Sequence, residues 1–404
     1  MLRKISYFFL ILLFVFSSKT QAQPDQEKYK IIAPHCLIRS ITAPYQIIHS
    51  LSDLTFIEVD SIGLNQLIKA KKNQKTMCGG FMNVTEDWNQ SKSKISAKTF
   101  LSSYAVKSFP VAQRSYDIHH EKEVNQLLKK LNPQHIWDNL TYFSQFQDRY
   151  ADSSYGVNAA HWLKTYVEDL AKSNHRQDVT VYTIETSKNA KHYKQPSVIV
   201  KIGSSNAAGI VIGAHMDTLS SLYELKPGAD DDGSGSMTVL EIATILLSNN
   251  MHFKKPIYLM WYAAEEEGLV GSGSVVSVFK KQSIPIEAVL HFDMTGFAYK
   301  NDPTMWLMTD YVNTTLVAFL EKLITTYVKQ PVKYSHCGYA CSDHAIWTKN
   351  GFAAAIAAEA AYEYTNKAMH SSNDTQDKLS LAHMTDYLKL GIAYTVELAE
   401  PLDQ

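Results

Sequence analysis

Net charge is almost absent from this chain of 404 residues, because 39 Lys and Arg residues face 40 Asp and Glu residues and leave a formal charge of −1. Such a balance excludes the basic footprint of a nucleic-acid-binding protein or of a basic membrane-binding surface. The chain also has no internal repeat and no low-complexity tract. Its 45% content of hydrophobic residues gives ample material for a core, which indicates an ordinary globular protein.

Long apolar runs are also missing, except near the N-terminus. Arg3 and Lys4 precede an apolar stretch over residues 5–16, and Thr20 and Ala22 stand at cleavage spacing in the polar segment that follows. This pattern predicts a secretory signal peptide over residues 1–22. A membrane anchor would need about 20 apolar residues, which this run does not reach. We therefore expect an exported, extracellular protein with no membrane contact after the signal is removed.

Cysteine is scarce, with four residues in the whole chain. An even number can pair completely in an exported protein. Cys337 and Cys341, in "CGYACSD", are close enough in sequence to bridge each other, and Cys36 and Cys78 would then pair by default. The alternative is four buried thiols.

The order of predicted elements divides the chain near residue 115. A small segment, residues 23–115, combines strand-like "TFIEVD" and "GGFMNV" with helix-like "IGLNQLIKAK". In residues 116–404, helical spacing broken at Asn132-Pro133 is followed by alternating strands and helices. This alternation predicts an α/β fold: a three-layer sandwich in which helices cover both faces of a mostly parallel mixed sheet, preceded by a small α+β segment.

Polar clusters stand at the ends of the predicted strands. "GIVIGAHMDT" ends in His215 and Asp217, "PIYLMWYAAEEEG" in three glutamates, and "AVLHFDMTG" in Asp293, while three successive aspartates in "PGADDDGSG" precede a helix. Ligands bind beyond the carboxyl ends of strands in such folds. Each cluster alone has a simpler explanation: Asp232 could cap the helix, and the glutamates could lie in a solvated loop.

Together, the clusters favour a metal centre. Carboxylates gathered beside an imidazole repel one another unless a cation compensates them. Histidine and carboxylate ligands suit zinc or a similar divalent ion. The surplus of carboxylates predicts two ions that share one bridging Asp of the triplet, an arrangement used for hydrolysis.

The motifs "GAHMDT", "PGADDDGSG", "AAEEEG", "DMTG", "CGYACSDH" and "MHSSNDT", in this order, resemble the bacterial leucyl aminopeptidase family of secreted two-zinc metallopeptidases. The resemblance covers about residues 120–400. It implies that Asp231 bridges two Zn²⁺ ions, with His215 and Asp293 on one ion and Glu266 and His370 on the other.

The resemblance also assigns roles around the metals. Asp217 would orient the ring of His215. Glu265, which points away from its neighbour Glu266, would act as the general base. A pocket for a large apolar side chain such as leucine would be lined by Met294, Leu307, Tyr339, Ile356, Tyr362 and Met369. Ala358 stands where family members can carry an aromatic residue, so we expect a roomier pocket and a preference broader than leucine.

The implied activity is release of N-terminal residues from peptides and proteins. Residues 23–115 would be a propeptide that a processing protease removes, although a permanent accessory domain is the alternative. A single-zinc glutaminyl cyclase on the same fold and an inactive peptidase fold kept as a binding module are two further alternatives. A carboxypeptidase is disfavoured because the motifs contain no Arg to receive a substrate carboxylate.

Overall fold

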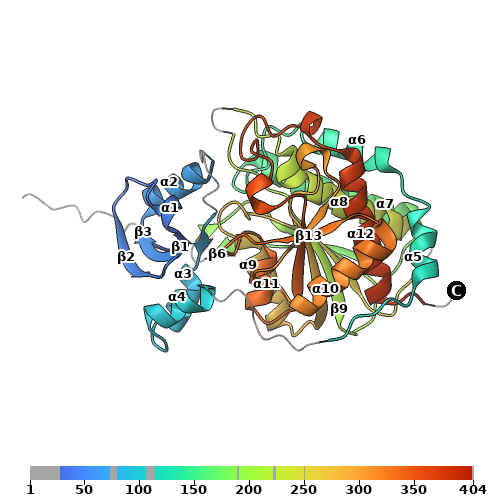
Figure 1. The fold of residues 1–404 in the computed structure, drawn as a ribbon, viewed down its shortest axis with the longest axis horizontal. Helices are drawn as coiled ribbons and strands as arrows, with labels where there is room; N and C mark the ends of the chain where they lie inside the picture. Colours follow the sequence, from blue (N-terminus) through green and yellow to red (C-terminus); the bar gives the residue numbers. More distant parts are fainter. Residues whose placement is uncertain are drawn as a thin grey trace, which may run out of the picture.

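The computed structural model describes residues 28–72, 80–105, 114–188, 191–221, 224–249 and 251–402. The predicted signal peptide lies outside these residues, and so does Cys78. The two larger of the three sheets in the described residues organise the structure. Figure 1 shows them side by side, the N-terminal part in blue and the larger part in green to red.

The N-terminal part is built around a small four-stranded sheet in the order β2-β3-β1-β4. Its described pairings, of β1 with β3 and β4 and of β2 with β3, are antiparallel. The elements are β1 (Tyr29–Pro34), α1 (His35–Ile38), β2 (Tyr45–Ser50), β3 (Leu54–Val59), α2 (Ser61–Lys72), β4 (Met82–Asn83), α3 (Thr85–Ser91) and α4 (Ala97–Ala105). The predicted strands at "TFIEVD" and "GGFMNV" and the helix at "IGLNQLIKAK" are confirmed as β3, β4 and α2.

The larger part begins with three helices and continues into an eight-stranded sheet in the order β13-β12-β14-β11-β9-β10-β8-β5. Its strands are β5 (Val179–Ile184), β8 (Ser197–Ile202), β9 (Gly209–His215), β10 (Ile257–Tyr262), β11 (Ile286–Phe292), β12 (Met305–Met308), β13 (Val332–Ser335) and β14 (Ala354–Ala358). The central four strands, β14, β11, β9 and β10, are mutually parallel, while β8, β5 and β12 join antiparallel. A separate short hairpin pairs β6 (Ser187–Lys188) with β7 (Lys191–His192).

Helices cover both faces of this sheet (Figure 1). One face carries α5 (Glu121–Leu128), α6 (Pro133–Phe143), α7 (Ser154–Ser173), α8 (Gly235–Ser248), α10 (Thr314–Leu323) and α12 (Leu381–Ala399), and the other carries α9 (Val270–Lys281) and α11 (His344–Lys349). Successive side chains of β10 point to opposite faces of the sheet. Leu259 therefore packs with the first set of helices, and Met260 packs with the second. The predicted three-layer α/β fold is therefore confirmed.

The sequence pattern does not predict some of the observed helices and strands. Strand β14 reads AAIAA, and alanine favours helix in isolation. Helix α9 reads VGSGSVVSVFKK, whose glycines, serines and valines disfavour helix. Both elements form because their apolar residues are buried against neighbouring layers, which overrides local propensity. The sequence pattern also does not predict the long helix α7, although Ser153 caps it by accepting the Gly156 amide and apolar residues recur along one face.

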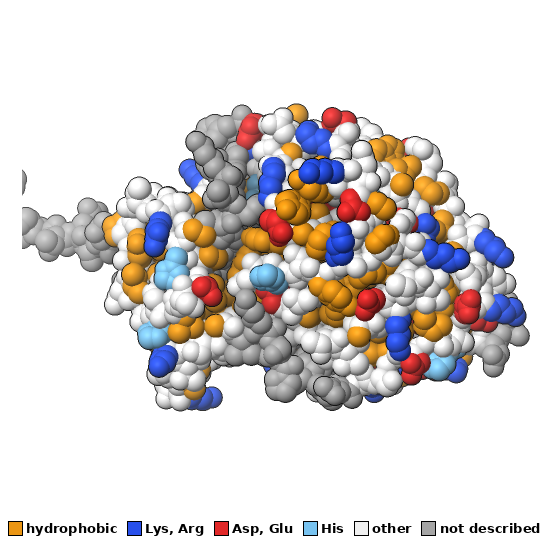
Figure 2. Space-filling model, in the orientation of Figure 1, with side chains coloured by type: hydrophobic (Ala, Val, Ile, Leu, Met, Phe, Trp, Pro, Cys, Tyr) orange, Lys and Arg blue, Asp and Glu red, His pale blue; other side chains and the backbone are white. Residues whose placement is uncertain are grey.

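The two parts share an apolar interface, which we name the interdomain cluster. It is formed by Ile32, Leu54, Phe56, Met82, Val84, Phe100, Leu101 and Tyr104 of the N-terminal part with Leu269, Tyr311, Ala340 and Ala345 of the larger part. At its edge, the Lys349 ammonium donates to an Asp87 carboxylate oxygen over 2.7 Å and lies over the Tyr104 ring. Figure 2 shows charges of both signs dispersed over the visible face.

No helix within the part of the chain that the structure describes is long and apolar enough to cross a membrane.

Candidate metal centre

Three strand ends bring the predicted residues together at one edge of the large sheet. His215 is the last residue of β9, Asp293 directly follows β11, and Glu265 and Glu266 follow β10 after two alanines. Because β10, β9 and β11 are parallel neighbours, their carboxyl ends meet. The aspartate triplet lies in the turn η1 (Ala229–Ser234), which leads directly into α8.

The three successive aspartates have different surroundings. Asp230 accepts a hydrogen bond from the Asn366 side chain over 2.9 Å. Asp232 accepts backbone N–H groups of Gly235 and Met294 on one oxygen and of His215 on the other. Both outer carboxylates therefore fix the loop.

The middle aspartate lies between two histidines. One carboxylate oxygen of Asp231, Oδ1, is 3.1 Å from Nε2 of His215, and the other, Oδ2, is 2.9 Å from Nε2 of His370. On the outer sides, His215 Nε2 is 3.7 Å from Asp293 and His370 Nε2 is 3.3 Å from Glu266. The five predicted ligands thus form two groups that share Asp231.

Side-chain atoms converge closely enough to hold cations. Two sets of three residues each have ligand atoms within 4.8 Å of one another: Asp231, Glu266 and His370 form one set, and His215, Asp232 and Asp293 form the second. The second set contains Asp232 in place of the predicted ligand Asp231, but the oxygens of Asp232 already accept three backbone amides. Nitrogen and carboxylate donors in this mixture fit zinc.

Electrostatic coupling across the centre is strong. Burial alone would lower the pKa of His370, but Glu266 and Asp231 raise it to about 10. Burial likewise opposes the charge of His215, yet its contacts with Asp217, Asp231 and Asp293 raise its pKa well above the ordinary range. The carboxylates thus favour positive charge at this centre, and a bound divalent ion would supply that charge.

Asp217 holds the loop that carries the two glutamates. Its Oδ1 accepts the amide of Glu265 over 3.0 Å, and its Oδ2 accepts the amide of Glu266 over 3.1 Å. The same carboxylate lies 3.6 Å from Nδ1 of His215. A single buried side chain therefore couples the end of β9 to the end of β10.

Backbone conformation is unusual around the centre. Ala264, Met294 and His370 have φ angles of 52°, 62° and 64°. The left-handed region costs a non-glycine residue about 1–2 kcal/mol, and such strain clusters at functional sites. The peptide bond between Asp231 and Asp232 is cis.

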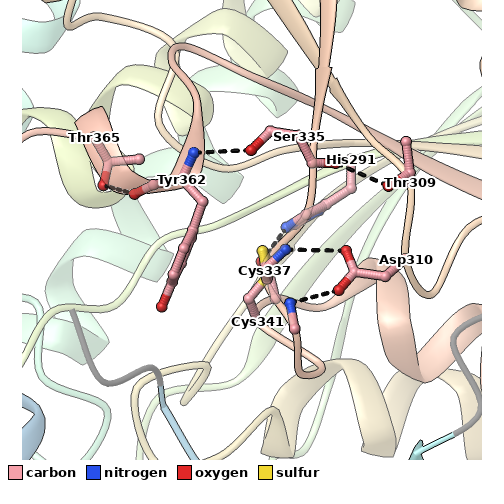
Figure 3. Close-up of a disulfide and its surroundings, with 10 residues drawn as sticks. His291, Thr309, Asp310, Ser335, Cys337, Cys341, Tyr362 and Thr365 are labelled. Atoms are coloured by element: carbon pink, nitrogen blue, oxygen red, sulfur yellow. Dashed lines mark hydrogen bonds between the residues drawn. A yellow bond between two sulfur atoms is a disulfide. The ribbon is translucent and has the colours of Figure 1, made fainter.

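The predicted disulfide between Cys337 and Cys341 is present. Figure 3 shows Asp310 accepting the amides of Cys337 and Gly338, which anchors this loop. Cys36 is also disulfide-bonded, and its predicted partner Cys78 lies outside the described residues.

The residues predicted to line a pocket fall into two sets. Leu307 and Ile356, on β12 and β14, are buried in the main core. Tyr339 and Tyr362 are half-buried, and their rings make an edge contact at 6.1 Å between centroids. Met294, which directly follows Asp293, is buried. Met369, which directly precedes His370, is half-buried.

Residues outside the predicted site also fix the centre. Asp374 accepts the amides of Asp230 and Asp231 on its two oxygens, each over 3.0 Å. Glu359 accepts amides of Phe297 and Asn366. Glu359 was missed because a single glutamate in an alanine-rich stretch carries no pattern.

Comparison with known proteins identifies the family to which this chain belongs. Residues 197–395 match the model of Peptidase family M28. Leucine aminopeptidase 1 of Colletotrichum graminicola is 37% identical over 290 residues, which span 69% of this chain and 71% of that protein.

Solved structures agree with this relationship. The Legionella pneumophila LapA aminopeptidase has 41% identity and a TM-score of 0.83, and the match covers 94% of this chain and 100% of that one. The zinc aminopeptidase BSAP of Bacillus subtilis, at 14% identity and a TM-score of 0.53 over 66% of this chain and 94% of that one, shares the fold. The chain therefore belongs to Peptidase family M28 and is a metallo-aminopeptidase.

Proposed function

We propose that this protein is a secreted aminopeptidase that uses two zinc ions to release a large apolar N-terminal residue, such as leucine, from peptides. The observation that carries the proposal is the position of Asp231, whose two oxygens face the Nε2 atoms of two different histidines at 3.1 and 2.9 Å. A bridging carboxylate requires this arrangement.

The remaining ligands follow from the same distances. His215 and Asp293 would complete the site on one side of Asp231, and Glu266 and His370 the site on the other. Asp217 would keep His215 and the glutamate loop in register through its two amide contacts. The proposed number of two ions rests only on the carboxylate of Asp231, which the two groups of ligands share.

Glu265 would act as the general base. Bound zinc would supply Lewis acidity, which makes a water acidic near neutral pH and polarises the scissile carbonyl. Glu265 is buried beside the proposed ligand Glu266, and Asp217 fixes its backbone by accepting its amide. It would take the proton of the attacking water and return it to the departing amine.

Side-chain preference would be set by an apolar pocket beside the disulfide loop. The half-buried Tyr339, Tyr362 and Met369 would contact the substrate, with Met294, Leu307 and Ile356 behind them. Ala358 lies on the same strand as Ile356, and its small side chain would leave room for a bulky substrate side chain. A large apolar first residue fits this lining.

Two observations support secretion: the apolar N-terminal stretch typical of a signal peptide and the Cys337–Cys341 disulfide. We assign residues 1–22 to the signal, 23–115 to a propeptide and 116–404 to the catalytic domain. The interdomain cluster supports the propeptide role, since it covers Leu269, just beyond the glutamate loop, and Ala340, inside the disulfide loop. A processing protease would uncover both loops.

The decisive experiment is hydrolysis of leucine p-nitroanilide by the secreted, processed protein, before and after chelation and with zinc added back. We expect chelation to abolish cleavage and zinc to restore it, with two zinc ions per chain in the restored protein. Cyclisation of N-terminal glutamine with one bound zinc would instead identify a glutaminyl cyclase. Zinc binding without turnover of any unblocked aminoacyl anilide would identify a binding module.

A further inference from the structure

A fully buried arginine lies directly behind the metal centre. Arg149 is in the segment between α6 and α7, and its side chain has no exposed surface. Arginine is rarely buried in this way unless its charge and donors are satisfied. No pattern in the sequence marks it, since it stands alone in "FQDRYAD".

Its guanidinium donates to backbone carbonyls only, among the contacts that the structure describes. Nε donates to Met216 over 2.8 Å, Nη2 to Gly228 over 2.7 Å, and Nη1 to Pro227 over 2.5 Å and to Phe143 over 3.4 Å. The planar group also lies over the Phe143 ring at 4.4 Å. The rigid, planar array of donors thus joins three separate segments.

Two of these segments carry proposed metal ligands. Met216 stands between His215 and Asp217, and Gly228 lies three residues before Asp231. The fit around the guanidinium is tight, because a Cβ at Gly228 would lie 2.8 Å from Nη2. Arg149 therefore fixes the separation between the end of β9 and the aspartate loop.

Charge adds to this geometric role. Burial lowers the pKa of Arg149 to about 10, although Asp374, Asp232 and other carboxylates of the centre favour its charged form. Arg149 therefore remains a cation at neutral pH. It compensates part of the negative charge without occupying a carboxylate oxygen that a zinc ion would need.

We propose that Arg149 is a positioning residue for the metal centre: by binding the carbonyls of Met216, Pro227 and Gly228, it holds His215 and Asp231 at the spacing that zinc binding requires. This inference rests on the proposed zinc-dependent function. It assigns Arg149 no contact with substrate, so removing it should change zinc affinity and turnover while leaving substrate binding little altered.

The test compares Arg149→Lys and Arg149→Met with the unmodified protein, using processed enzyme. Zinc affinity is measured by competition with a chelator, kcat and KM are measured with leucine p-nitroanilide at saturating zinc, and thermal unfolding reports folding. Arg176 offers a matched control: it is also buried and donates to the Leu246 carbonyl, but it pairs with Asp178 away from the centre. Arg176→Lys and Arg176→Met are therefore made in parallel.

We expect Arg149→Met to lose about 10–100-fold in zinc affinity, the range typical of residues that orient ligands. Its kcat at saturating zinc should fall while KM stays within about twofold, and Arg149→Lys should restore part of both losses. The Arg176 variants should lower the unfolding temperature only. Arg149 variants that fold with unchanged zinc affinity and kcat would overturn the inference.

If Arg149→Met does not fold, Arg149→Lys decides by the same criteria, because it keeps the charge but cannot reach all the carbonyls. Failure of the proposed function has a different signature, since the unmodified protein would then bind zinc without cleaving the anilide. Zinc affinity would still test the positioning role in that case.

Discussion

Replacing Asp217 with asparagine tests how far one buried carboxylate organises the metal centre. The change keeps the size of the side chain and removes its charge. Asp217 accepts the amides of Glu265 and Glu266 on different oxygens and lies 3.6 Å from Nδ1 of His215. Asparagine keeps one acceptor oxygen, so its NH₂ group must face the backbone N–H of either Glu265 or Glu266, and that hydrogen bond is lost.

The expected magnitude follows from the bonds that are lost. A hydrogen bond to a charged group contributes about 1.5–3 kcal/mol, and at least one of the two amide contacts cannot form in the variant. A loss of about 2 kcal/mol corresponds to about 30-fold in an equilibrium constant. Because Asp217 links the residues that would hold both ions, we expect a fall of that size in zinc affinity, with kcat reduced at saturating zinc.

The assay is chelator competition for zinc combined with anilide hydrolysis. Asp310→Asn is the matched control, because Asp310 also accepts two consecutive amides on separate oxygens, those of Cys337 and Gly338. The control should leave zinc affinity unchanged. If Asp217→Asn folds and binds zinc as tightly as the unmodified protein, the reasoning from these contacts is refuted.

The remaining predictions concern the base, the bridge, the pocket and the interdomain contact. Glu265→Gln should lower kcat by about 10²–10⁴-fold with full zinc content, and near-normal turnover would remove the proposed base. Asp231→Ala should lose zinc from both positions; metal analysis that finds two ions per chain contradicts the bridging assignment. Ala358→Phe should narrow the pocket, so that the ratio of kcat/KM for leucine over alanine anilide falls; an unchanged ratio places Ala358 outside the pocket. Lys349→Met should loosen the N-terminal part, seen as faster tryptic release, and an equal rate argues against this contact. Burial raises the pKa of Asp87, but Lys349, Lys188 and Lys280 together lower it below its ordinary value. The Asp87–Lys349 pair should therefore stabilise docking above pH about 4, and this stabilisation should be lost as the pH falls below that value.

Much of the fold could be predicted because hydrophobic periodicity and strand length are local properties. The strands around β8, β9, β10 and β11 read as nearly continuous apolar runs, which buried strands of an α/β sheet require. Strand β14 and helix α9 could not be read in this way. Their residues have propensities for other conformations, and only burial between the sheet and the neighbouring layers selects the structure that forms.

The sequence by itself determined the kinds of residue at the candidate site and their positions at strand ends, because the carboxyl ends of parallel strands meet whatever the details of packing. The residue pattern did not distinguish the three aspartates, and only the resemblance named Asp231. The tertiary structure supplies the physical reason: backbone amides from β9 and from the loop after β11 bind Asp232 and leave Asp231 between His215 and His370. It also placed Arg149 behind the centre. Three of its four partners are backbone carbonyls more than 60 residues away along the chain, those of Met216, Pro227 and Gly228. Because carbonyls are present at every position, no pattern of side chains could reveal these contacts.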